Sequence, residues 1–493
     1  MENLALGTIA APLGSAILIL IVTKWWKRFA DIWATVVGGF TLIASILLIG
    51  SGPIVYRMGG WAPPWGICLV LDPLSEFMLL VVNLLGFFVT VYSLSYMEWY
   101  TNKPKFFALF LLMMAGMNGV VLTGDMFNLF VFLEIASLSS YALVGFGVEA
   151  EELEASFKYL ILGSIASTLI LFGVAIIYSV TGSLNMADIS VFLKETGNNA
   201  AVLLATALFF AGFATKAALV PFHAWLPDAH PSAPAPVSAM LSGVLVKALG
   251  VYAMARVFYN VIPVDPIFLK VIMVLGVISM LVGGLLAIGQ WDIKRMLAYS
   301  TISQIGYIFL GLSLGTALGL VGAIFHLLNH STYKGLLFLC SGSIEKATGS
   351  RDMREFGGLS KKMPVTSIAT SIGALSISGI PPFAGFWSKL IIIIACFRAG
   401  KTVPGVIAVG VAFITISYYV KLQKYTLFGK LPDKLAKVKE SPFAMSSAMI
   451  ILAVLCLALG LGYPLLNSSI LSPAANSLLD TTGWGYITNV LGF

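Results

Sequence analysis

The chain has 493 residues, of which 59% are hydrophobic and only 10% are charged. Soluble proteins carry about 25% charged residues, so this composition excludes a soluble globular protein and indicates a chain that crosses a membrane many times. The net charge of +7 implies no nucleic-acid partner, because the lysines and arginines in membrane-protein loops orient the chain in the bilayer. The cysteines stand singly, which disfavours a zinc site, an iron–sulfur cluster or a disulfide framework.

Apolar stretches long enough to cross a bilayer recur along the chain. The first lacks a basic n-region and is as long as the later ones, so we interpret it as a retained helix and not as a cleaved signal. With about 20 apolar residues needed per span, the pattern predicts an all-α polytopic membrane protein with about 14 transmembrane helices. These are expected near 4–22, 31–50, 71–96, 106–123, 126–148, 155–180, 200–226, 233–260, 267–289, 292–314, 316–343, 364–399, 403–428 and 442–466.

Basic residues gather in alternate loops, and this asymmetry predicts the orientation. By the positive-inside rule the loops that contain Lys103, Lys294 and Arg351 lie in the cytoplasm, and an even number of spans puts both termini outside. The acidic segment 149–154 falls on the same side, which does not conflict with the rule because acidic residues contribute little to it. We therefore expect a multi-pass protein of the cell membrane.

Prolines interrupt two of the apolar segments. The first break contains Pro221 and a Pro-rich passage that ends at Pro236, and the second contains Pro381 and Pro382. A proline removes a backbone donor and frees a carbonyl, which hydrocarbon tolerates only where protein or water satisfies these groups. The pattern predicts two discontinuous helices, 7 and 12, beside polar cavities.

The two breaks resemble each other, which predicts an internal repeat. Residues 220–225 read VPFHAW and residues 381–387 read PPFAGFW, and the predicted helices between them put equivalent helices on opposite sides of the membrane. This is the inverted-repeat plan of many transporters, with a site near the bilayer midplane. The predicted divisions are 1–105 (helices 1–3), 106–260 (first five-helix repeat), 261–430 (second, inverted repeat) and 431–493 (helix 14 and tail).

Glu134 lies in an apolar stretch, where a bare carboxylate would protonate unless a cation lies beside it. Lys216, next to the first break, is the natural partner. Two interpretations stay open. The pair either locks two helices together, or changes in strength as protons move and so controls the lysine.

Further ionisable residues lie within the predicted spans. A buried lysine without a fixed counter-charge, such as Lys247, can act as a relay group. His326, His330 and Lys334 follow at i, i+4 and i+8, on one helical face with about 6 Å per step. Histidine titrates near physiological pH, so this row suits a proton wire. A zinc site is disfavoured, because no HExxH glutamate or third ligand is apparent. Core histidines that bond helix carbonyls stay an alternative.

Lys389 follows the second break and is expected to end the relay, while His230 in the first break is a candidate for proton uptake from the cytoplasm. No nucleotide-binding glycine motif, nucleophile elbow or cysteine cluster is present. The sequence therefore predicts no cofactor, no metal and no catalytic residue of its own. Redox chemistry or ATP hydrolysis would have to come from a partner.

At this point the chain resembles the antiporter-like proton-translocating subunits of respiratory complex I and of Mrp sodium/proton antiporters. The motifs are FVFLEIASLSSYALV, FATKAALVPFHAWLPDAHPSAPAPVSAMLSGVLVK, DIKRMLAYSTISQIGYIFLG, FHLLNHSTYKGLLFL and SGIPPFAGFWSK, in family order. The resemblance implies inverted five-helix repeats, a Glu134–Lys216 pair, a second-half lysine at Lys334 and a terminal lysine at Lys389. Within the family the chain is similar to Mrp D subunits and to their counterparts in Mrp-like membrane-bound hydrogenases. Lys389 stands where one complex I subunit has glutamate, and the chain ends without that complex's long lateral helix.

We therefore expect a proton-translocating subunit of a hetero-oligomeric cation/proton antiporter, with sodium as the exchanged ion and other membrane subunits as partners. Three alternatives stay open. They are a subunit of a redox-driven complex, a membrane scaffold that transports nothing, and a stand-alone transporter of an organic solute. The scaffold is disfavoured because it has no reason to meet the desolvation cost of several buried ionisable groups.

Overall fold

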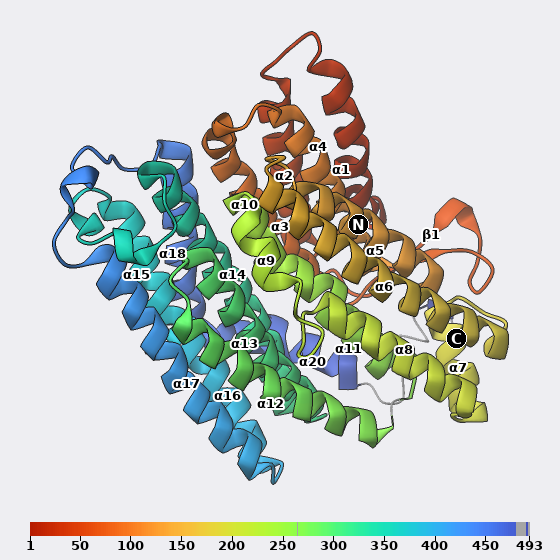
Figure 1. The fold of residues 1–493 in the computed structure, drawn as a ribbon. Helices are drawn as coiled ribbons and strands as arrows, with labels where there is room; N and C mark the ends of the chain where they lie inside the picture. Colours follow the sequence, from red (N-terminus) through yellow and green to blue (C-terminus); the bar gives the residue numbers. More distant parts are fainter. Residues whose placement is uncertain (264, 480–489, 492–493) are drawn as a thin grey trace.

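The computed structural model describes residues 1–263, 265–479, 490 and 491. Long helices lie side by side along a common direction and enclose a buried interior (Figure 1). The first six are α1 (Glu2–Val22), α2 (Phe29–Leu48), α3 (Pro73–Tyr96), α4 (Lys103–Leu122), α5 (Met126–Val144) and α6 (Ala150–Thr181). Their outward-facing side chains are apolar and are stable only against lipid or other membrane subunits. The structure is therefore that of a polytopic membrane protein.

The segment between α2 and α3 forms an antiparallel hairpin that was not predicted from the sequence. Strands β1 (Ile54–Arg57) and β2 (Cys68–Leu71) pair in the register Ile54 with Leu71. A short helix, α7 (Met186–Thr196), was also missed. Both elements are too short to reach the span length on which the prediction depended.

The first break lies between α8 (Ala200–Lys216) and α9 (Leu226–Ser232). The expected helix 200–226 was wrong at its end, because the helix stops at Lys216. Ala218 follows with a positive φ of 55°, which turns the chain out of the helical path. The freed backbone groups find partners: Trp225 Nε1 donates to the Thr215 carbonyl at 2.9 Å, and the Val220 amide donates to Ser279 Oγ at 2.9 Å. The break is therefore satisfied by protein side chains.

After α9 the chain enters a helix that is buried except at Tyr259 and contains π-helical turns. It consists of α10 (Ala235–Met240), η3 (Leu241–Leu245), η4 (Lys247–Tyr252), α11 (Ala253–Arg256) and η5 (Val257–Val261). A π-helical turn widens the hydrogen-bonding pattern from i+4 to i+5 and is frequent at functional sites.

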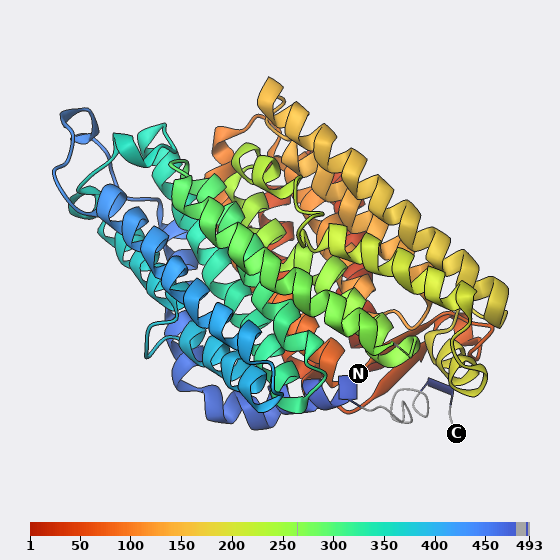
Figure 2. The ribbon, with the colours of Figure 1, turned by 60° about the horizontal axis from the view of Figure 1, so that its bottom comes forward.

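The second half begins with α12 (Pro266–Gly289), which packs on α13 (Ile293–Ser313) as α6 packs on α8 (Figure 2). Next come α14 (Ala317–Thr348) and the second discontinuous helix, α15 (Pro364–Ser378) and α16 (Ala384–Arg398). The remaining helices are α17 (Thr402–Leu422), η8 (Gln423–Leu427), α18 (Phe443–Leu461), α19 (Tyr463–Leu466), η10 (Asn467–Leu471) and α20 (Ser472–Leu479). Short 3₁₀ turns are η1 (Met58–Gly60), η2 (Met97–Trp99), η6 (Met353–Glu355), η7 (Leu359–Lys361) and η9 (Asp433–Leu435).

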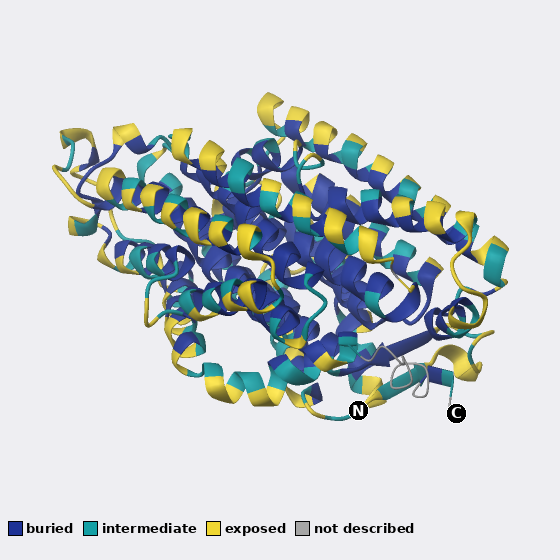
Figure 3. Cartoon of the chain, turned by 90° about the horizontal axis from the view of Figure 1, so that it is seen from below, coloured by how far each residue is buried: buried dark blue, intermediate teal, exposed yellow. Residues whose placement is uncertain are grey.

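Among the described residues, ten helices are long and apolar enough to cross a membrane. α13 and α14 are outside that set, and so are the halves of the two broken helices. Exposed residues lie on the outward faces of the bundle and buried residues fill its centre (Figure 3). The outward faces carry large apolar side chains such as Phe172 and Phe413, as expected for a surface in contact with lipid or other membrane subunits. The total of about 14 spans stays a prediction.

Two helix ends differ from the expectation on the predicted cytoplasmic face. The helix expected near 155–180 begins earlier, within the acidic segment: α6 starts at Ala150, with Glu149 as its N-cap and Glu152 in a capping box. α14 continues to Thr348, and Gly349 with a φ of 73° ends it, so Glu345 lies on a helix.

Candidate functional site

Glu134 on α5 lies close to Lys216 at the end of α8, with its side chain 24% exposed. The distance from Lys216 Nζ to Glu134 Oε1 is 3.9 Å. The lysine is 4% exposed, and its ammonium donates to Ser137 Oγ at 2.9 Å and to Tyr141 OH at 3.1 Å. Glu134 in turn accepts a hydrogen bond from the Ser167 hydroxyl. The Lys216 ammonium is thus held mainly by hydroxyl groups. The Glu134 carboxylate lies near the longest distance at which two such groups count as an ion pair.

The partners of Lys216 come from one face of α5, since Ser137 and Tyr141 lie at i+3 and i+7 from Glu134. These two partners were not predicted, although their spacing from Glu134 is visible in the sequence. Lys216 also occupies the last residue of α8, where unpaired carbonyls give the helix end a partial negative charge that favours a cation.

Lys247 lies in the π-helical stretch and is fully buried. Its ammonium donates to the carbonyl oxygens of Ser242 and, at 2.8 Å, Gly243. Among the described residues, no carboxylate lies within ion-pair distance of it. The lysine therefore depends on backbone dipoles of its own helix for stabilisation.

The face of α14 predicted from the spacing is present in the structure. His326 and His330 have ring centroids 6.2 Å apart with planes 3° from parallel. Lys334 continues the row and donates to the Leu297 carbonyl at 2.7 Å and to Tyr419 OH at 3.3 Å. Both ring nitrogens of His330 are buried without a hydrogen-bond partner among the described residues.

α16 brings the last lysine to this row. His326 Nδ1 lies 2.9 Å from the hydroxyl of Ser388, the neighbour of Lys389. Lys389 is buried, donates to the Ile377 carbonyl at 2.7 Å, and lies 5.2 Å from the ring centroid of Tyr307. The Ile377 carbonyl belongs to the last turn of α15, so the helix end at the second break supplies the hydrogen-bond acceptor of Lys389.

His230 lies within the first break on α9, and it is fully buried. Its ring stacks on Phe338 with 4.6 Å between centroids, and neither ring nitrogen has a hydrogen-bond partner in the described part of the chain. His230 is therefore enclosed by protein and does not contact bulk water.

The three prolines named from the sequence lie in the turns between half-helices, Pro221 after α8 and Pro381 and Pro382 before α16. In the part of the chain that the structure describes, no group of three or more histidine, cysteine or acidic side chains could hold a metal ion. The four lysine ammonium groups are held by hydroxyls and backbone carbonyls, with the Glu134 carboxylate close to Lys216.

Residues 123–415 match the family described as NADH:quinone oxidoreductase/Mrp antiporter, TM, and residues 59–107 match NADH-ubiquinone oxidoreductase (complex I), chain 5 N-terminus. The chain belongs to this family of antiporter-like membrane subunits. It is 38% identical over 453 residues to NADH-quinone oxidoreductase subunit N of Desulforudis audaxviator, covering 86% of this chain and 90% of the relative. It is 32% identical over 499 residues to the D subunit of the Na(+)/H(+) antiporter of Alkalihalophilus pseudofirmus, covering all of both chains.

Solved structures agree with this assignment of the antiporter-like subunit. A chain of the Mrp complex from Dietzia sp. DQ12-45-1b superposes with a TM-score of 0.91 at 33% identity, over 100% of this subunit and 99% of that chain. A chain of an archaeal membrane-bound sulfane sulfur reductase gives 0.92 at 33% identity, over 100% of both. These relatives are components of multi-subunit membrane complexes, so the antiporter-like subunit works with other membrane subunits.

Proposed function

We propose that this antiporter-like subunit translocates protons within a D-type Mrp cation/proton antiporter, and that sodium is the exchanged cation. The name of the Alkalihalophilus relative, which aligns over its whole length, supports the type of complex. The observation that carries the proton-translocating role is the row of ionisable residues within the predicted spans, all buried except Glu134, whose side chain is 24% exposed. It comprises Glu134, Lys216, Lys247, His326, His330, Lys334 and Lys389.

The energetic argument rests on the lysines. Lys247, Lys334 and Lys389 are each at most 2% exposed, and their partners are carbonyl and hydroxyl oxygens. A buried ammonium without a carboxylate is expensive, and such residues within a membrane mark ion or proton paths. Each lysine can release its proton and accept another while its neutral dipolar partners stay in place.

The breaks divide the path into two halves. Protons enter one half beside α9, pass laterally along Lys247, His330 and His326, and leave by the half that ends at Lys389. Waters bridge the separations that exceed direct contact. Glu134 controls Lys216: when the carboxylate moves closer it stabilises the ammonium, and when it withdraws only Ser137 and Tyr141 hold the charge.

The test uses the assembled complex in proteoliposomes, with sodium-dependent proton flux as the measurement. Lys247→Ala is expected to lower flux by at least about a hundredfold, in the range that positioned proton donors contribute. Lys362→Ala, a substitution on the partly exposed 359–363 segment, is the control and is expected to leave flux unchanged. Wild-type flux in Lys247→Ala per assembled complex would contradict the proposal and favour the scaffold alternative.

The second candidate is the same proton path in a redox-driven complex. The 38% identity to NADH-quinone oxidoreductase subunit N and the TM-score of 0.92 to the sulfane sulfur reductase chain favour it. Isolation of the native complex separates the two. Small antiporter subunits alone would support the antiporter, whereas iron–sulfur proteins in fixed stoichiometry would support the redox-driven complex.

A further inference from the structure

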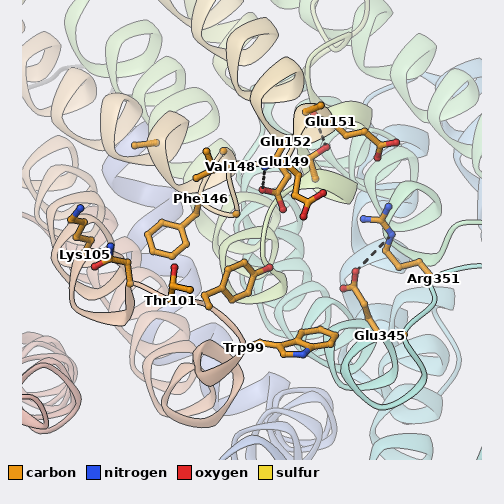
Figure 4. A pocket seen from close by; sticks show the side chains of 18 of the residues that line it. Trp99, Thr101, Lys105, Phe146, Val148, Glu149, Glu151, Glu152, Glu345 and Arg351 are labelled. Carbon is orange, nitrogen blue, oxygen red and sulfur yellow. Dashed lines mark hydrogen bonds and ion pairs between the residues drawn. The ribbon is translucent and has the colours of Figure 1, made fainter.

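A large hollow opens on the predicted cytoplasmic face. Its volume is ≈ 1250 Å³, and its walls come from the α3–α4 and α5–α6 connections, the start of α13 and the end of α14 (Figure 4). Glu149, Glu151, Glu152 and Glu345 all line it. The relay described above does not use this hollow, although Ser232 at the end of α9 forms part of its wall.

Glu345 lies where the hollow meets the protein interior. Its side chain is 19% exposed, and its Oε2 lies 2.7 Å from Nζ of Lys294, whose side chain is 3% exposed. The two charges are close, but Oε2 accepts no aligned hydrogen bond. On the other side Arg351 approaches Oε1 at 3.8 Å (Figure 4). The carboxylate thus joins a buried ammonium to a hollow large enough to hold many waters.

Lys294 connects this carboxylate to the first break. Its ammonium also donates to the Ala233 carbonyl at 3.1 Å, directly after the short helix that carries His230. His230 has two buried ring nitrogens without a partner in the described residues, so either nitrogen is able to accept a proton. The order from the surface inward is therefore the hollow, Glu345, Lys294 and His230.

We infer that Glu345 and Lys294 form the proton-uptake gate that joins the cytoplasmic hollow to His230 and the interior relay. This inference rests on the proposed proton-translocating function. A hydronium ion in the hollow gives its proton to the Glu345 carboxylate and leaves water. The neutral carboxyl no longer holds the Lys294 ammonium, which remains with the Ala233 carbonyl. Glu345 then passes its proton through water to a ring nitrogen of His230, and the restored carboxylate recaptures Lys294.

The test is chemical rescue of Glu345→Ala in proteoliposomes with the cytoplasmic face outward. Flux per assembled complex is expected to fall at least about tenfold, since the variant lacks the positioned carboxylate. Formate added outside is expected to restore flux several-fold, because it fits the hollow and supplies a carboxylate. A purely structural role of Glu345 would give a loss that formate does not change, and that result overturns the inference.

Glu151→Ala is the matched control, because Glu151 lines the same hollow but does not contact Lys294. The flux of Glu151→Ala is expected to equal that of the wild type and to be unchanged by formate. Glu345→Gln keeps the side-chain size if Glu345→Ala fails to assemble, and wild-type flux in Glu345→Gln overturns the gate. Lys247→Ala, measured in parallel, separates the two proposals: full flux in Glu345→Gln with loss in Lys247→Ala rejects only the gate, whereas full flux in both rejects the proton path itself.

Discussion

Lys216 Nζ lies 3.9 Å from Glu134 Oε1, yet its hydrogen bonds go to Ser137 and Tyr141 of the same α5 face. The carboxylate is bound by a serine of a third helix, Ser167 on α6. Lys216 and Glu134 therefore each have a neutral hydrogen-bond partner, which stays bound when the two charges move apart. This arrangement suits a pair of variable strength better than a static link, because neither charge would be left without a hydrogen bond.

Removal of the neutral partners of Lys216 is expected to slow proton flux without abolishing it. A hydrogen bond to a charged group contributes about 1.5–3 kcal/mol. Tyr141→Phe is expected to lower sodium-dependent flux about tenfold or more, while Lys216→Ala abolishes it. Tyr178→Phe, which removes an exposed hydroxyl on α6, is the control and is expected to match wild type. Equal flux in Tyr141→Phe and wild type would show that the tyrosine does not support the ammonium.

A buried ion pair outside the relay stabilises the fold. Arg256 donates to both oxygens of Asp72, at 2.6 and 2.7 Å, and thereby joins the buried π-helical stretch to the start of α3. Asp72→Asn leaves the guanidinium without its counter-charge, which costs about 3–5 kcal/mol for a buried pair. Thermal unfolding in detergent is expected to occur at a clearly lower temperature in this variant.

The partly exposed pair of Lys103 and Asp31, at 2.9 Å, provides the comparison for that measurement. Asp31→Asn is expected to change stability by no more than about 1 kcal/mol, because solvent reaches this pair and Lys103 keeps its bond to the Leu94 carbonyl. Similar unfolding temperatures in Asp72→Asn and Asp31→Asn would contradict the expectation that the buried pair contributes more to stability.

The same aspartate predicts a pH dependence of stability. Burial raises the pKa of Asp72, but the Arg256 charge and the hydrogen bonds from Arg256 and Ser75 outweigh it and leave the pKa below its ordinary value. A carboxyl with a lowered folded-state pKa stabilises the fold above its unfolded pKa of about 3.9 and loses that contribution as the pH falls through the folded value. Unfolding temperature is therefore expected to fall in acid more steeply in wild type than in Asp72→Asn; parallel curves would refute the assignment.

Gly385 allows α16 to approach α15 at the second break. A Cβ at this position would lie 1.8 Å from the Ser376 carbonyl oxygen, which belongs to the backbone and cannot move aside. Gly385→Ala is expected to separate the half-helices, move Lys389 from the Ile377 carbonyl, and lower both stability and flux. Because the added Cβ would overlap the carbonyl oxygen, Gly385→Ala can also reduce assembly. Assembly yield and flux are therefore both measured.

Gly410 on α17 is the matched glycine, because nothing lies within 4 Å of its Cβ position. Gly410→Ala is expected to leave flux unchanged and to raise stability by up to about 1 kcal/mol, the helix propensity difference between the residues. Tolerance of Gly385→Ala equal to that of Gly410→Ala would mean that the close approach is not needed.

Much of the architecture could be predicted from the sequence because hydrocarbon penalises charge and unpaired backbone severely. Long apolar runs therefore indicated the spans, prolines marked both breaks, and the spacing of His326, His330 and Lys334 gave their common face. The end of α8 was predicted wrongly, since the turn at Ala218 depends on partners from distant segments. The inverted repeat and the domain divisions stay predictions.

Composition and local spacing were enough to identify a many-helix membrane protein with ionisable residues beside two helix breaks. The groups that meet became known only from the folded chain: Lys216 with the α5 hydroxyls, Lys389 with the end of α15, and Lys294 with Glu345 beside the hollow on the predicted cytoplasmic face. These contacts join residues far apart in the chain, and no local pattern records them. The partner of a buried charge is set by how the helices pack.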